Sequence, residues 1–181
     1  VGEITALLKK LGIYQNTLMF FTSDNGAAKR FDGIHNSSGV MQGKKRSLNE
    51  GGIRVPMVVR WPGKIKAGRV SSHPWYFPDV MPTFAEIGGV STEVPEDIDG
   101  ISILPTLLDK GVQKQHEYMF WQYGVRAVRS GKWKGIGKGG HLYLYDLSED
   151  IEEKNDLSSK HPKIAARMKK LSLIHISEPT R

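Results

Sequence analysis

The chain has 181 residues, a formal net charge of +7 at pH 7 and no cysteine. This length suits one sizeable core, or one core with a small appendix. The composition excludes disulfides and thiolate metal sites within these residues, and no apolar run approaches the roughly 20 residues of a membrane-spanning helix. The basic residues form separate short clusters without a groove-reading motif, which favours a solvated surface, or in part an anionic substrate, over nucleic acid.

The first elements predict an α/β sheet. Apolar residues at positions 4–11 follow the i, i+3, i+4, i+7 spacing of an amphipathic helix, and Gly12 ends it. The run "TLMFFTS" is short and apolar on both faces, which is typical of a central parallel strand covered by helices. After a loop rich in Gly, Asn and Ser at 26–50, residues 57–61 predict a second strand. Ligands are expected beyond the carboxyl ends of such strands.

The remaining elements predict a change of architecture. Asp79 is expected to cap a helix that ends at Gly88 and Gly89, and a shorter helix is expected over 103–108. Beyond residue 111, short aromatic and β-branched runs separated by Gly turns predict an antiparallel sheet of three or four strands. An acidic loop and a final helix from Pro162 complete a small α+β appendix.

The letters "FFTSDNG" end the first apolar run in a carboxylate and an amide, Asp24 and Asn25. Hard oxygen ligands of this kind suit Ca²⁺ or Mg²⁺. Asp-Asn-Gly is also common turn chemistry, so the letters by themselves leave both readings open. Two ligands do not make a site, and their partners would have to come from elsewhere.

A basic loop, "GKKRSLNEGGIRVP", precedes the second strand. Its three consecutive cations offer point charges that can hold an oxyanion, and the glycines at 51 and 52 allow positive φ or close backbone approach. A solvent-facing loop that aids solubility is the alternative. His35, on the long loop, either lines a substrate pocket or is an exposed loop histidine, and Trp121 and Tyr123 are core residues or lie at a pocket rim.

Six motifs in order carry a family resemblance: "TLMFFTSDNG", "GKKRSLNEGGIRVPMVVRWPGKI", "DVMPTFAEIGGV", "DGISILPTLL", "AVRSGKWK" and "LYDLSED". Together they resemble the C-terminal half of a type I sulfatase, in the alkaline-phosphatase-like superfamily, over residues 1 to about 170. The resemblance implies an α/β fold: the C-terminal part of a mixed-sheet core with a small C-terminal antiparallel α+β subdomain. It also implies a catalytic portion at 1–111 and that subdomain at 112–170.

The resemblance implies roles for particular residues. Asp24 and Asn25 match the family's second pair of ligands for the active-site cation, usually Ca²⁺, with Mg²⁺ as the other option. Lys45 lies five positions before Glu50 and matches the lysine that binds the substrate sulfate, with Lys44 as its neighbour in a shifted register. His35 is expected in the substrate pocket. Glu50, Gly51, Gly52 and Arg54 match the motif as structural residues.

The implied activity is hydrolysis of sulfate esters, aryl or carbohydrate, by a formylglycine nucleophile. The family makes formylglycine from Cys or Ser in a C/S-x-P-x-R motif near its N-terminus, so we expect the nucleophile and the first aspartate pair upstream of residue 1. We therefore expect the 181 residues alone to be inactive. A phosphatase, phosphodiesterase or phosphonate hydrolase of the superfamily, or a degenerate binding relative, remains an alternative. A periplasmic or secreted location is implied by the family alone.

The last eleven letters, "LSLIHISEPTR", bear no relation to the preceding pattern. They resemble the in-frame translation of a transposon-type sequencing adaptor. We therefore expect residues 171–181 to lie outside the native sequence.

Overall fold

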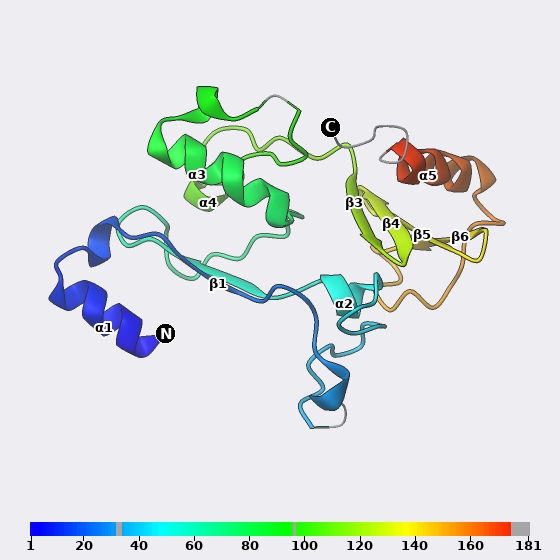
Figure 1. Cartoon of the computed structure of the whole chain (residues 1–181), viewed down its shortest axis with the longest axis horizontal. Coiled ribbons are helices and arrows are strands. Elements are labelled where there is room, and N and C mark those ends of the chain that lie inside the picture. The colour runs from blue at the N-terminus through cyan, green and yellow to red at the C-terminus, as the bar shows by residue number, and fades with distance from the viewer. Residues whose placement is uncertain (32–33, 96, 175–181) are drawn as a thin grey trace. The chain divides into compact units, whose positions relative to one another are not determined.

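The computed structural model describes residues 1–31, 34–95 and 97–174, and these form two compact units (Figure 1). Unit 1 comprises Val1–Thr22 and Met57–Gln115, and unit 2 comprises Ser23–Pro56 and the chain from His116 onward. By packing, the long loop between the first two strands thus groups with the C-terminal sheet, whereas the sequence grouped it with residues 1–111.

Unit 1 begins with α1 (Gly2–Lys10), η1 (Tyr14–Asn16) and the strand β1 (Met19–Thr22), as the periodicity predicted. β1 pairs with β2 (Met57–Arg60). The pairing is antiparallel, so the expectation of a parallel strand is wrong for this pair. A parallel partner needs a crossover that carries the chain back along the sheet, whereas this connection re-enters the sheet at the end where it left.

The rest of unit 1 is helical: η3 (Phe77–Asp79), α3 (Val80–Gly88), η4 (Ser91–Glu93) and α4 (Leu104–Leu108). Gly89 ends α3 in the left-handed conformation, φ 74°, as predicted. The expected cap is wrong, because the Asp79 carboxylate makes no cap bond to α3. It is fully buried and accepts hydrogen bonds from the amides of Tyr76 (3.0 Å) and Ile101 (2.8 Å), so it joins two loop segments.

Unit 2 contains the predicted antiparallel sheet, in the order β3 (Met119–Tyr123), β4 (Val125–Ser130), β5 (Trp133–Lys138) and β6 (His141–Asp146). The final helix, α5 (Pro162–Ile174), covers one face of it. The core on this face consists of Val128, Leu142, Leu144, Met168 and Leu171. The sheet and the helix confirm the fold predicted for the C-terminal appendix.

The opposite face of the same sheet is covered by the long loop. Leu48 packs with Ala127, Ile136 and Tyr145, and the short helix α2 (Glu50–Ile53) follows it. A 3-10 turn, η2 (Lys29–Phe31), lies earlier in the same loop. The sheet of unit 2 is therefore sandwiched, with α5 on one side and the loop that carries the candidate site on the other.

Helix α5 continues past residue 170 into the letters attributed to an adaptor. Leu171 is 7% exposed and belongs to the core beneath the helix. Residues 175–181 lie outside the described structure. Among the described helices, none combines the length and the apolar character needed to cross a bilayer.

Candidate active site

Two backbone hydrogen bonds join the segment after β1 to the basic loop. The Gly26 amide donates to the Gly52 carbonyl at 2.8 Å, and the Lys45 amide donates to the Ala27 carbonyl at 2.9 Å. Two segments that form separate motifs, about twenty residues apart in the sequence, therefore lie side by side in unit 2. The structure brings the Asp-Asn pair and the lysine loop together at the level of the main chain.

The glycines of this junction allow its main-chain segments to lie in close contact with one another. A Cβ on Gly26 would overlap the Gly51 carbonyl oxygen, and one on Gly52 would overlap the Ser47 carbonyl oxygen. A Cβ on Gly51 would lie 2.5 Å from the Gly43 carbonyl oxygen. Of the two reasons that the sequence offered for the Gly-Gly pair, close backbone contact is the one observed, because neither residue has a positive φ.

Asp24 and Asn25 lie in the bend that leaves β1. Asp24 is exposed, and its carboxylate takes part in no hydrogen bond or ion pair with the described residues. The local turn bond comes instead from the Ser23 hydroxyl, which donates to the Asn25 carbonyl at 2.9 Å. Since the turn is closed without the Asp24 carboxylate, that group is left available for a ligand.

These oxygens fit part of a site for a hard cation. A carboxylate and an amide oxygen suit Ca²⁺ or Mg²⁺, which take about six or more oxygen ligands. In the part of the chain that the structure describes, no three His, Asp or Glu residues gather as a metal cluster. The fit of Asp24 and Asn25 is therefore that of two ligands of a larger set.

Lys45 and Lys44 differ in their surroundings. Lys45 is exposed, and its ammonium has no hydrogen-bond or ion-pair partner in the described chain, whereas Lys44 is half-buried. The backbone on either side turns tightly through left-handed conformations at Gly43 (φ 81°) and Arg46 (φ 75°). The main chain thus fixes the position of the Lys45 backbone, and the Lys45 ammonium remains available to a ligand. This difference favours Lys45 over Lys44 as the anion-binding residue.

His35 lies in the exposed part of the long loop. Ser38 ties that part of the loop to the glycine turn, since its hydroxyl donates to the Gly51 carbonyl at 3.5 Å. His35 is therefore on the same loop as the site, and its place in a substrate pocket stays a prediction.

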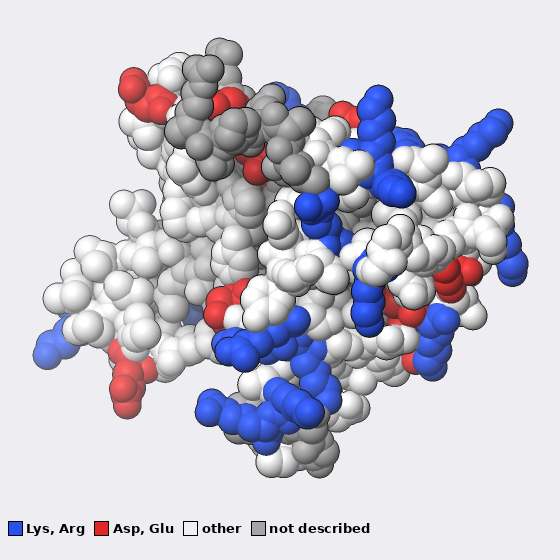
Figure 2. Space-filling view, turned by 45° about the vertical axis from the view of Figure 1, so that its right-hand side comes forward, with Lys and Arg blue, Asp and Glu red and all other residues white. Residues whose placement is uncertain are grey.

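On the face shown in Figure 2, Lys and Arg side chains stand in several separate groups, as the dispersed sequence clusters indicated.

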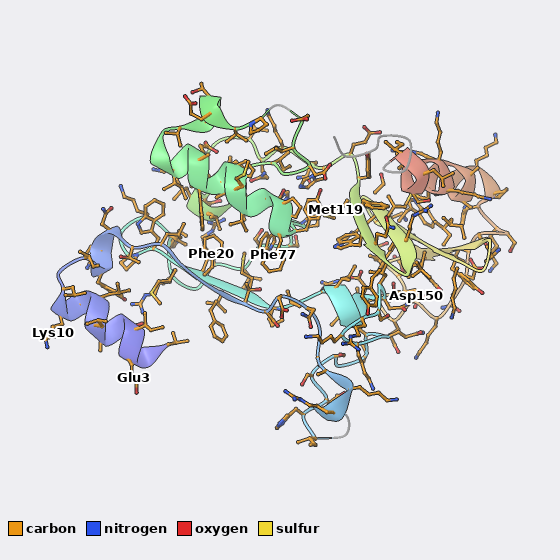
Figure 3. All side chains as sticks on the ribbon, viewed as in Figure 1. Glu3, Lys10, Phe20, Phe77, Met119 and Asp150 are labelled. Atoms are coloured by element: carbon orange, nitrogen blue, oxygen red, sulfur yellow. The ribbon has the colours of Figure 1, made fainter. Side chains whose placement is uncertain are left out.

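A buried ion cluster holds the basic loop against the sheet of unit 2, and the sequence reading missed it. Lys134 on β5 is fully buried, and its ammonium lies 2.7 Å from Glu50 Oε1 and 2.8 Å from Glu153 Oε1. The Glu50 amide donates to Glu153 Oε2 at 2.7 Å. Figure 3 shows that side chains fill the region between the short helix α2 and the sheet of unit 2. Glu50 and Lys134 are 84 residues apart, so no local pattern announces the pair.

Groups near this cluster have shifted pKa values. Burial lowers the pKa of Arg129 on β4, and the negative charge of Glu50 acts in the opposite direction. Burial raises the pKa of Tyr145 to about 12, and the charge of Glu153 raises it further. Both shifts follow from the low solvent access between the loop and the sheet.

A match to the pattern C/S-x-P-x-R also stands at the C-terminal end of this sequence. The letters at 177–181 read S-E-P-T-R, which matches the pattern C/S-x-P-x-R. They stand at the opposite end of the chain from the family's motif, within the stretch that resembles an adaptor, and outside the described residues. A pattern with three fixed positions is weak by itself, and the identity of the nucleophile stays a prediction.

Comparisons with known proteins identify the family to which the chain is similar. A family model described as "Sulfatase" matches residues 1–90. Steryl-sulfatase of Mus musculus is 40% identical over 149 residues, which cover 75% of this chain and 24% of that protein. N-acetylgalactosamine-6-O-sulfatase of Bacteroides thetaiotaomicron is 32% identical and covers 94% of this chain.

A solved structure extends the similarity to the fold. A Bacteroides thetaiotaomicron protein, described in work on glycosaminoglycan metabolism, superposes with a TM-score of 0.78 at 31% identity over 94% of this chain and 41% of its own. The chain spans 24% and 38% of the two curated relatives named above. The similarity therefore concerns less than half of each relative's length and 75% to 94% of this chain.

Proposed function

The chain belongs to the sulfatase family of the alkaline-phosphatase-like superfamily, and from this premise we propose that the whole protein hydrolyses sulfate esters. The observation that carries the proposal is the junction in unit 2. Its two main-chain hydrogen bonds bring the carboxylate-amide pair beside a lysine whose ammonium is unpaired in the described structure. A cation-binding pair next to an anion-binding group is what a sulfate ester requires.

Each residue has a role in the proposed chemistry. Asp24 and Asn25 hold a divalent cation, Ca²⁺ or Mg²⁺, together with ligands from outside this set. When bound, such a cation supplies a Lewis acid and a template for the ester. Lys45 binds the sulfate oxygens and offsets the negative charge that develops on them as the ester bond breaks. His35 lines the pocket. The nucleophile, by family analogy a formylglycine, comes from another part of the protein.

The substrate class follows from the relatives by analogy. Their names include a steryl-sulfatase and an N-acetylgalactosamine-6-O-sulfatase. We propose an aryl or carbohydrate sulfate for this protein and, by analogy with the family, a periplasmic or secreted location. The fold does not choose among these esters, because pocket loops set that choice.

The test is turnover by the complete gene product, with an aryl sulfate and the matching aryl phosphate as substrates. We expect sulfate hydrolysis at least 100-fold faster than phosphate hydrolysis, and loss of activity on removal of divalent cations. The Asp24→Ala variant should lose both activity and cation binding, measured by calorimetry, while its circular dichroism stays unchanged. A preference for phosphate would favour the phosphatase alternative. An inactive wild-type protein that binds no cation would favour the degenerate relative.

A further inference from the structure

The buried ion cluster of unit 2 holds two carboxylates and one ammonium in a place without solvent. Glu50, Lys134 and Glu153 are each 2% exposed or less. Arg54 approaches Glu50 from the surface, with Nη1 3.5 Å from Oε2. Burying such charges is expensive and often adds no stability compared with apolar residues of the same volume. A cluster of this kind is more readily explained by the arrangement that it enforces.

We propose that Lys134 is a positioning residue for Lys45. Resting on the sulfatase function proposed above, this means that the cluster sets the place of the sulfate-binding lysine from the C-terminal sheet. Lys134 does not touch the substrate. It acts through Glu50 and the turn that follows it.

The first step of this connection runs from the sheet to α2. Lys134 projects from β5 and contacts Glu50, the first residue of α2. Glu153, which pairs with the same ammonium, also accepts the hydrogen bond from the Glu50 amide. Glu50 is therefore held at its main chain and at its side chain by the same pair of partners, which fixes the start of α2 in position and direction.

The second step runs from α2 to the basic loop. Gly51 and Gly52 lie against carbonyl oxygens of the loop, and neither Cα has room for an added methyl group. The Gly51 amide also donates to the Gln42 carbonyl at 2.7 Å. Since these contacts are between main-chain atoms, the loop cannot shift relative to α2 by rotating a side chain. A displacement of Glu50 must move the loop.

The third observation is that the loop is tied to the sheet on both sides of Lys45. Before it, the Gln42 side-chain amide donates to the Glu153 carbonyl at 3.2 Å. After it, Leu48 is buried among Ala127, Ile136 and Tyr145. Glu153 thus contacts the loop at Gln42 and the start of α2 at Glu50. Lys45 lies between these anchors, so its place is determined by the sheet.

The matched control for Lys134 is Lys132, just before the same strand. The Lys132 ammonium pairs with Asp146 Oδ2 at 2.6 Å, but its side chain is 52% exposed, whereas that of Lys134 is fully buried. The variants Lys134→Met and Lys132→Met each remove one cation from an ion pair in unit 2. Only the first removes it from the cluster that holds the loop.

The first experiment needs no enzyme activity. Trypsin cleavage after residues 44–46 is followed by mass spectrometry in the complete gene product, well below the unfolding temperature. We expect Lys134→Met to speed cleavage at these positions at least 10-fold and Lys132→Met to leave it within 2-fold of wild type. If Lys134→Met fails to fold, Glu153→Gln is measured in the same way, because it keeps an acceptor for the Glu50 amide while removing the charge. Equal cleavage in the Lys132→Met protein and the folded cluster variant would overturn the proposal.

The second experiment separates positioning from general stability. We expect Lys134→Met to lower kcat/KM at least 10-fold for an aryl sulfate when Lys45 is present, and less than 2-fold in a Lys45→Ala background. An equal loss in both backgrounds would show that Lys134 does not act through Lys45. An inactive wild-type enzyme would instead contradict the proposed function, and the cleavage assay would still decide whether the cluster holds the loop.

Discussion

Units 1 and 2 differ in how their sheets bury apolar surface. In unit 2, both faces of the sheet carry a buried apolar cluster. In unit 1, Phe20 on β1 packs edge-on against Phe84 at 5.6 Å, but Phe21 and its cross-strand partner Val58 are 61% and 63% exposed. A two-stranded sheet is marginal by itself. The candidate site is thus attached to the more completely packed sheet, that of unit 2.

The comparison predicts a difference that matched substitutions can test. Met168 on α5 is 1% exposed, and Met81 on α3 is 50% exposed. Met168→Ala should destabilise unit 2 by about 2–5 kcal/mol, because it leaves a cavity in a closed core. Met81→Ala should change unit 1 by about 1 kcal/mol or less, since less surface is buried there. Hydrogen exchange of amides in β4 to β6 and in β1 and β2 measures the two units separately. Equal destabilisation by Met168→Ala and Met81→Ala would contradict the expected difference between the two units.

A smaller effect is expected from the glycine turn. Gly52→Ala places a methyl group against the Ser47 carbonyl, and we expect a loss of about 1–3 kcal/mol in the exchange protection of unit 2. Gly2→Ala is the control in unit 1, because no heavy atom lies within 4 Å of its added Cβ. That change should stabilise α1 by about 0.5–1 kcal/mol. A neutral Gly52→Ala would show that the junction is looser than its contacts indicate.

The smallest expected effect is the loss of stability of unit 2 at low pH. Burial alone would raise the pKa of Asp156, but hydrogen bonds from the amides of Leu144 (3.0 Å) and Ser158 (2.9 Å) and from His141 hold it well below its ordinary value. The stabilisation is therefore present above the unfolded pKa of about 3.9 and is lost as the pH falls through the lower folded value. The hydrogen-exchange protection of unit 2 should therefore decrease below about pH 4. In the Asp156→Asn variant this decrease should be less steep.

The control for this pH effect lies in unit 1. Asp109 pairs with Arg69 at 3.1 Å on the surface, with the carboxylate side chain 72% exposed. Asp109→Asn should leave the acid dependence of unit 1 nearly unchanged, because exposed pairs contribute little. An acid response of unit 2 that survives Asp156→Asn in full would place its origin in another carboxylate.

The sequence predicted the elements whose signals are local. The spacing of apolar residues predicted α1. The Gly-separated aromatic runs predicted an antiparallel sheet of three or four strands, and unit 2 has four. The position of Lys45 came from counting along a motif. The direction of β2 was missed, because an apolar run does not encode which way its neighbour runs. The role of Asp79 was also missed, because its partner Ile101 is 22 residues away and a capping pattern is local.

The candidate site was predictable in part for the same reason. Asp24, Asn25 and Lys45 stand in recognisable motifs, and the main-chain bonds at Gly26 and Lys45 bring those motifs together. The cluster that holds the loop was not predictable, since a lysine in the strand pattern "KWKGI" looks exposed until its partners at 50 and 153 are known. Long-range pairing of buried charges is the information that the sequence alone lacked.

The most direct measurement of the central claim compares two neighbouring lysines. In the complete gene product, kcat/KM for an aryl sulfate is measured for Lys45→Ala and for Lys44→Ala, with circular dichroism to verify folding. We expect a loss of at least 100-fold for Lys45→Ala and less than 10-fold for Lys44→Ala, because, of these two lysines, Lys45 has the exposed side chain and no partner for its ammonium among the described residues. A larger loss in Lys44→Ala, or near-normal turnover in Lys45→Ala, would contradict it.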